Sequence, residues 1–170
     1  NNNIRVEMTT ATQFAQIIYT KDGSEPNAYL PILQPSAMYN NPVLVNSSTT
    51  LKAKGRRTFF SNSETVSGEY ILKCGLPELT PDSGSFTDSV TVVISTVTEN
   101  AKIYYTLDGS EPDDSSMMYE GPLKFGIGDY VIRSKAFKFG FEESETAFAE
   151  FSVDQAGIAP EITENPNDIE

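Results

Sequence analysis

A nine-residue motif occurs twice in this chain, and this repeat constrains the fold more than any other feature of the sequence. Residues 18–26 read Ile-Tyr-Thr-Lys-Asp-Gly-Ser-Glu-Pro, and residues 104–112 read Tyr-Tyr-Thr-Leu-Asp-Gly-Ser-Glu-Pro, at a separation of 86 (104 − 18). A match of this length indicates a duplicated structural unit. We therefore predict that the chain consists of two copies of one domain.

Further matches follow the first one at smaller separations. Residues 37–42 match residues 117–122 at a separation of 80, and Lys52 matches Lys135 at a separation of 83. The decrease from 86 to 80 places six extra residues in the first copy, around residues 29–34 (86 − 80 = 6). The similarity thus extends over most of each copy.

The hydrophobic pattern inside each copy is typical of β-strands. Ile4, Val6 and Met8 alternate with polar residues, which is the period of two expected where one face of a strand is buried. Further alternating segments are expected at residues 49–54, 66–72, 130–138 and 147–153. No stretch has a helical period. Short strands at this spacing predict an all-β chain with one β-sandwich in each copy.

The ends of the two copies differ. Residues 76–86 precede the first strand of the second copy and contain Pro77 and Pro81, so we expect an edge strand there. The first copy has no such segment, whereas residues 159–163 match residues 76–80 at a separation of 83. The expected divisions are residues 1–74, a first copy that lacks its opening edge strand; residues 75–157, a complete second copy; and residues 158–170, a tail resembling the start of a third.

The composition argues against catalysis by this chain. It contains no histidine and one cysteine, Cys74, which excludes imidazole bases, Ser-His-Asp triads, most zinc sites and an internal disulfide. A net charge of −12 disfavours nucleic acid, whose phosphates attract Lys and Arg. No run of about 18 apolar residues indicates a membrane span. We expect no enzymatic activity, no cofactor, no nucleic-acid partner and no membrane insertion.

The two Asp-Gly-Ser-Glu-Pro segments are candidate structural turns. Asp accepts a backbone hydrogen bond two residues on, Gly adopts positive φ and Pro ends the strand ladder, so a structural role is favoured. The motif residues are Tyr19, Asp22, Gly23, Pro26, Tyr39, Tyr105, Asp108, Gly109, Pro112 and Tyr119. A less favoured alternative is a calcium site, because carboxylate oxygens are the ligands that calcium prefers. Its candidate ligands are Asp108, Glu111, Asp113 and Asp114.

Exposed aromatic side chains are the candidates for binding a glycan, because sugars stack their C–H faces on flat rings. Tryptophan is absent, so phenylalanine and tyrosine must supply such a surface. Tyr104, Phe139 and Phe141 form the candidate platform of the second copy, with Phe59 and Phe60 in the first. Ordinary packing or contact between domains is the favoured alternative for these rings.

Several of these elements together resemble a known family. Residues 77–86 carry Pro-x-x-x-Pro-x-Ser-Gly-x-Phe, residues 104–112 carry the turn motif, and residues 119–122 carry Tyr-x-Gly-Pro. In this order they resemble the chitobiase/β-hexosaminidase C-terminal domain. The resemblance implies an immunoglobulin-like or fibronectin III-like sandwich that accompanies catalytic or surface domains without being catalytic itself.

We therefore expect a non-catalytic accessory, spacer or protein-interaction module from a longer multidomain protein, with neighbouring domains of that protein as its partners. The expected location is extracellular or at the surface of a bacterial cell. Alternatives are a carbohydrate-binding module of a secreted glycoside hydrolase, and a strand-exchanging component of a filament or of an intracellular eukaryotic assembly.

The distribution of charge supports the strand-exchange alternative. Residues 1–75 carry seven Lys or Arg and five Asp or Glu, a net charge of +2 (7 − 5). Residues 76–170 carry five and nineteen, a net charge of −14 (5 − 19). Unlike charges favour a head-to-tail contact, so the tail 158–170 could add itself as a strand to the first copy of another chain.

Overall fold

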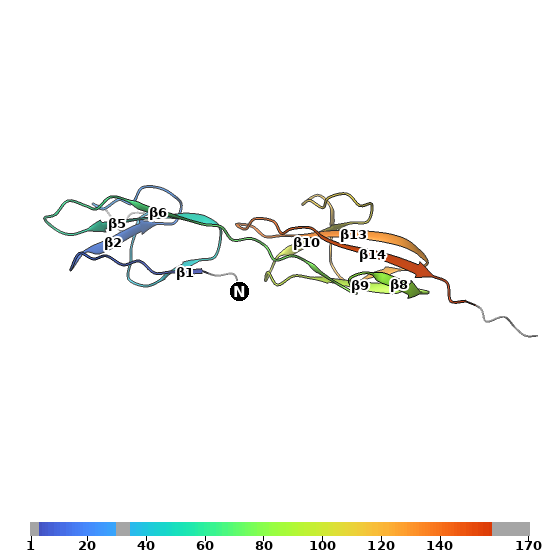
Figure 1. Ribbon diagram of the computed structural model, residues 1–170. Helices are drawn as coiled ribbons and strands as arrows, with labels where there is room; N and C mark the ends of the chain where they lie inside the picture. The colour runs from blue at the N-terminus through green and yellow to red at the C-terminus, as the bar shows by residue number, and fades with distance from the viewer. Residues whose placement is uncertain (1–3, 30–34, 158–170) are drawn as a thin grey trace, which may run out of the picture.

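The computed structural model describes residues 4–29 and 35–157. All the regular structure in these residues is β-strand, which confirms the predicted all-β class. The strands form two units that lie end to end and give the molecule an elongated shape (Figure 1). In the described residues there is no helix that is long and apolar enough to cross a lipid bilayer. The tail expected to open a third copy, residues 158–170, lies outside the described residues.

Six strands make up the first unit, in two sheets. They are β1 (Ile4–Val6), β2 (Gln16–Thr20), β3 (Ala37–Met38), β4 (Val43–Val45), β5 (Thr49–Arg56) and β6 (Val66–Tyr70). One sheet has the order β3-β2-β5-β6 and the other consists of β1 and β4, with antiparallel pairing throughout. Their apolar faces enclose a small core that contains Val43, Val45 and Leu51.

Eight strands make up the second unit. They are β7 (Glu78–Thr80), β8 (Gly84–Thr87), β9 (Val90–Ser95), β10 (Lys102–Thr106), β11 (Met117–Met118), β12 (Leu123–Phe125), β13 (Gly128–Phe137) and β14 (Ala147–Asp154). The two sheets have the orders β11-β10-β13-β14-β8 and β12-β9-β7. In β9 and β14 buried and exposed residues alternate, so one face of each strand points into a larger core that includes Val92, Ile132 and Phe151. Two sheets packed face to face form the predicted β-sandwich.

Strands β1 to β6 correspond one by one to β9 to β14. Ile18 of β2 pairs with Lys54 of β5, and the equivalent Tyr104 of β10 pairs with Lys135 of β13. Lys54 is therefore the counterpart of Lys135, at a separation of 81 (135 − 54). The match of Lys52 with Lys135 expected from the sequence is wrong by two residues, because strand pairing and not residue identity decides which positions are equivalent.

The segment that opens the second unit differs from the expectation. Residues 76–86 form two short strands and not one edge strand: β7 pairs antiparallel with β9, and β8 pairs parallel with β14. Each strand covers the edge of a different sheet, which leaves fewer backbone groups unpaired. In the described residues of the first unit, no strand corresponds to β7 or β8.

Candidate functional site

Both Asp-Gly-Ser-Glu-Pro segments fold into the same closed turn. The Asp108 carboxylate accepts hydrogen bonds from the backbone N–H and the hydroxyl of Ser110, at 3.0 and 2.6 Å. These bonds lower the pKa of Asp108 below its ordinary value. Gly109 has a φ of 79°, which favours glycine, and Gly23 in the first unit has a φ of 77°. Asp22 makes the same two bonds to Ser24, so both turns hold their own shape.

The other residues of the motif attach each turn to its core. Pro112 is fully buried, and Pro26 is buried at the equivalent position. The tyrosines Tyr105 and Tyr119 pack against the core of the second unit, and Tyr19 and Tyr39 pack against that of the first. This arrangement agrees with a structural role for the motif.

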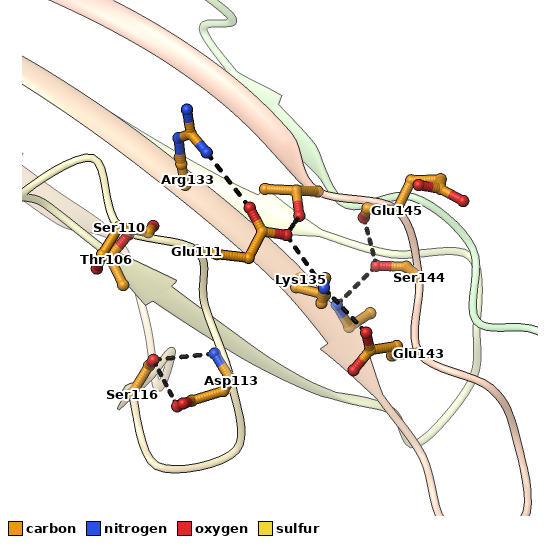
Figure 2. A network of polar contacts seen from close by, with 12 residues as sticks. Thr106, Ser110, Glu111, Asp113, Ser116, Arg133, Lys135, Glu143, Ser144 and Glu145 are labelled. Atoms are coloured by element: carbon orange, nitrogen blue, oxygen red, sulfur yellow. Dashed lines mark hydrogen bonds and ion pairs between the residues drawn. The ribbon is translucent and has the colours of Figure 1, made fainter.

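The glutamate of each turn makes an ion pair with a lysine on the adjacent long strand. Glu111 lies 3.1 Å from Lys135 and 3.3 Å from Arg133, and it also accepts a hydrogen bond from the Thr146 hydroxyl (Figure 2). Lys135 is 3.0 Å from Glu143 as well. Together these contacts link the turn after β10 to β13 and to the residues that lead into β14.

The first unit repeats this arrangement with Glu25. Lys54 lies 2.7 Å from its carboxylate, and Thr65 donates a hydrogen bond to it. We call the set Glu25, Lys54 and Thr65, and its equivalent Glu111, Lys135 and Thr146, the turn clamp. In both units the hydrogen bonds and the lysine lower the pKa of the glutamate, so the carboxylate stays ionised near neutral pH. An ionised carboxylate has no proton to give, which argues against its use as the general acid of glycoside hydrolysis.

The four calcium candidates do not converge on one point. Asp108 faces its own turn, Glu111 belongs to the turn clamp, and Asp113 binds the hydroxyls of Ser115 and Ser116 at 2.7 and 3.0 Å. No group of three or more potential metal-ligating side chains occurs among residues 4–29 and 35–157. The four residues, Asp114 included, are therefore not brought together as ligands.

The three aromatic candidates of the second unit do share one surface. Tyr104, Phe139 and Phe141 line an open hollow of about 550 Å³. The Tyr104 ring meets Phe137 edge-on at 5.4 Å, and the Lys138 ammonium lies 4.6 Å from the centre of the Phe141 ring. Phe139 is fully exposed. Tyr104 and Phe141 are half-buried, so Phe139 is the one of the three candidates whose ring lies fully in solvent.

A continuous set of contacts joins the two units. Glu142 donates its backbone N–H to the Leu72 carbonyl at 2.8 Å, and Cys74 donates to the Glu142 carbonyl at 2.9 Å. Ser48 donates to the Gly140 carbonyl, and Phe141 packs against the cores of both units. We call these residues the joint.

Cys74 lies in this joint and not in a reactive environment. Its side chain is buried, and burial raises the pKa of the thiol. Because the thiolate is the nucleophilic form, this environment favours packing over reactivity.

Comparison with known families agrees with the resemblance in the sequence. Residues 81–148 match the family model of the chitobiase/β-hexosaminidase C-terminal domain. This match covers 68 of the 170 residues (148 − 81 + 1), all of them in the second unit. Residues 6–70 match a different model, described as Fn3 associated. That both units belong to one family therefore remains a prediction. The comparison with curated proteins found no matching sequence.

Solved structures with similarity to this chain include bacterial modules and a murine protein. Fibronectin(III)-like modules of Clostridium thermocellum CbhA are 15% identical, with 96% of this chain and 90% of that chain covered and a TM-score of 0.34. Murine CEACAM1b is 11% identical, with 88% and 92% covered and a TM-score of 0.31. The fold assignment here rests on the sheets themselves.

Sequence reasoning missed two features of this chain. One is the turn clamp, whose lysine and threonine lie 24 and 35 residues after Glu111 (135 − 111 and 146 − 111). A comparison of the two copies at the correct separation of 81 would have found it, since Lys54 and Thr65 recur as Lys135 and Thr146. The other is the joint, because Gly140, Phe141 and Glu142 contact residues of the other unit and no motif marks those partners.

Proposed function

We propose that this chain is a non-catalytic accessory module that holds its neighbours apart as a rigid spacer in a longer, glycoside hydrolase-like protein. The observation that carries the proposal is the joint. A flexible linker would leave the units free to rotate, whereas here backbone hydrogen bonds and the shared Phe141 fix one unit on the other. The family match fits an accessory module of this kind.

The rigidity of the joint can be measured by residual dipolar couplings. We expect both units of the native chain to share one alignment tensor. A Cβ at Gly140 would come within 2.7 Å of the Ser47 Cβ, so Gly140→Ala should separate the two tensors. Gly109→Ala is the matched control, because Gly109 has the same φ of 79° but no atom within 4 Å of its Cβ position. Two different tensors in the native chain would contradict the spacer proposal.

The non-catalytic part of the proposal has its own test. The purified chain should leave aryl-hexosaminide substrates unchanged, because the carboxylates of the turn clamp are held ionised by their lysines. Turnover above a buffer blank that is lost on changing one carboxylate to its amide would overturn this part.

Carbohydrate binding at the aromatic hollow is the second candidate function. Its support is that Tyr104, Phe139 and Phe141 line one surface. We expect chitin or a related polymer to retain the protein, and Phe139→Ala to weaken this retention. Phe14→Ala is the control, since Phe14 is 80% exposed but lies outside the hollow and outside the candidate aromatic residues. If the polymer retains the Phe139→Ala variant as strongly as the native chain, the carbohydrate-binding function is contradicted and only the spacer role remains.

For the compartment, we propose export to the outside of a bacterial cell. The match to the chitobiase/β-hexosaminidase C-terminal domain supports this proposal. Detection of the protein in the external or surface fraction of its native cells would test it.

A further inference from the structure

The loop that leaves β5 in the first unit has the same shape as the loop that leaves β13 in the second. The Ser63 hydroxyl accepts a backbone N–H of β5 at 2.8 Å, and the Ser144 hydroxyl accepts one of β13 at 2.9 Å. Each of these hydroxyls donates to the carbonyl of the next residue. We call residues 57–64 the first tip and residues 138–145 the second tip, at a separation of 81 (138 − 57 and 145 − 64). The two tips can therefore be compared residue by residue.

The second tip makes three contacts of the joint with the first unit. The Glu142 N–H donates to the Leu72 carbonyl at 2.8 Å, and the Glu145 carboxylate makes an ion pair with Lys73. Phe141 packs against the cores of both units. We call residues 72–74 the exit segment of the first unit, and this segment forms a parallel bridge with Glu142. The second tip thus binds the exit segment of the unit before it.

The first tip repeats the aromatic part of this arrangement at the end of its unit that faces away from the second. β5 begins beside Ser48 of the joint and ends at the first tip (Figure 1). Arg57 lies 4.5 Å from the centre of the Phe60 ring, as Lys138 lies 4.6 Å from that of Phe141. Phe141 is half-buried between two cores, whereas Phe60 is 61% exposed.

The polar groups of the second tip also have counterparts in the first. Ser61 corresponds to Glu142, and it makes no backbone hydrogen bond with another described residue. Glu64 corresponds to Glu145, is exposed, and forms no ion pair within residues 4–29 and 35–157. The backbone donor and the carboxylate that hold the exit segment in the joint are therefore both present in the first tip.

Two phenylalanines at this end of the first unit adopt a left-handed backbone, where glycine and asparagine are usual. Phe59 has a φ of 69° and is fully exposed, whereas its counterpart Gly140 has a φ of 79°. Phe14 has a φ of 60° and is 80% exposed, and its counterpart at a separation of 86 (100 − 14) is Asn100, with a φ of 58°. Phe14 lies at the same end because the start of β2 pairs with the end of β5. A bulky ring in this conformation is strained and leaves apolar surface in water, so packing within the described part of the first unit does not account for it.

We propose that the first tip is an interface for another β-sandwich domain, which lies against it as the first unit lies against the second tip. This inference rests on the proposed spacer function and names the kind of neighbour that the spacer holds. The exit segment of that domain runs beside Ser61 and accepts its N–H. It presents a basic residue to Glu64, as Lys73 is presented to Glu145 in the joint, and an apolar surface covers Phe60.

Phe59 sets one requirement on this partner. Gly140 lies so close to the first unit that a Cβ there would come within 2.7 Å of the Ser47 Cβ. Phe59 stands in the place of Gly140, so the partner must have a hollow for a ring where the first unit has Ser47. A surface identical to that of the first unit in the joint would not fit, and the interface is therefore selective for a different domain.

Hydrogen exchange in the intact longer protein tests the proposal. The Ser61 amide should exchange about tenfold more slowly there than in the 170-residue chain, because it gains the hydrogen bond that Glu142 has in the joint. Nuclear Overhauser contacts from the Phe60 ring should lead to residues of a β-strand domain. Equal exchange rates, or contacts from this ring to a helical domain, would overturn the proposal. The spacer function is judged separately, by the alignment tensors of the two units.

Two variants of the intact protein examine the interface itself. Phe60→Ala should return the Ser61 amide to its rate in the 170-residue chain. The Ser63 amide donates to the Gly55 carbonyl at 2.9 Å within the first unit, so its exchange reports whether the loop is still folded. Glu64→Lys keeps the ring and reverses the exposed charge, and it should also speed exchange at Ser61. If Phe60→Ala loosens the Ser63 amide, Glu64→Lys alone decides.

Phe148→Ala is the matched control. Phe148 is 52% exposed, similar to Phe60, but lies on β14 of the second unit, so this variant should leave the Ser61 amide slow. The proposal is overturned if the Ser61 amide stays slow in both first-tip variants, or if Phe148→Ala speeds its exchange.

Discussion

The two units have the same turns and the same strand registers, but they differ in how their sheets are closed. In the second unit, β7 and β8 cover one edge of each sheet, and Phe151 is only 2% exposed. Its counterpart in the first unit, Tyr70 on β6, is half-buried. The repeated motif thus accompanies the same turns and the same strand pairing in both units. Residues outside the motif, in β7 and β8, account for the lower exposure of the core of the second unit.

The largest effect on stability is expected when the equivalent aromatic ring is removed from each unit. We expect Phe151→Ala to destabilise the second unit by about 3–5 kcal/mol, the usual cost of deleting a buried ring. Tyr70→Ala should cost the first unit clearly less, because its ring is already partly in water. Denaturant unfolding followed by NMR signals from each unit measures both values. Equal losses would contradict the difference in closure.

The next prediction concerns β7, the strand that covers the edge of β9 in the second unit. Leu79→Ala should destabilise the second unit by about 2–3 kcal/mol, because it removes a buried side chain from the strand that seals the edge. Hydrogen exchange at residues 93–95 should become faster, since these residues pair with β7. Unchanged exchange there would mean that β7 contributes little to closure.

The turn clamps predict a dependence of stability on pH in both units. The Thr146 hydrogen bond and the Lys135 ion pair lower the pKa of Glu111, so the folded state binds fewer protons than the unfolded state. This contribution is complete above the unfolded pKa of about 4.3 and is lost as pH falls through the lower folded value. Glu111→Gln should weaken the acid sensitivity of the second unit and leave the first unaffected. Glu25→Gln should do the reverse.

The smallest effect is expected at a buried hydroxyl. Ser134 is fully buried, and its hydroxyl has no hydrogen-bond partner among the described residues, whereas its counterpart in the first unit is Ala53. Ser134→Ala should therefore leave the second unit equally stable or stabilise it by about 1 kcal/mol. A loss of stability in thermal unfolding would show that the hydroxyl has a partner in solution.

Much of the fold follows from local pattern. The positive-φ glycines of the turns and the repeated motif act over a few residues, and most strands and turns lie near where this pattern places them. The alternation in residues 4–8 is an exception, because β1 covers only Ile4–Val6 and Ile4 is 37% exposed. The candidate aromatic surface was also predictable in part, because Tyr104, Phe139 and Phe141 line one hollow, but of the three only Phe139 is fully exposed.

The sequence by itself determined the all-β class, the turns and the division of the chain into two similar halves, because these depend on neighbouring residues and on visible repeats. Only the tertiary structure decided the true equivalence of Lys54 with Lys135, the splitting of residues 76–86 into two strands, the turn clamps and the joint. Each of these depends on which strands pair or pack across the molecule. Partners such as Glu111 and Lys135, or Leu72 and Glu142, lie 24 (135 − 111) and 70 (142 − 72) residues apart and leave no periodic mark in the sequence.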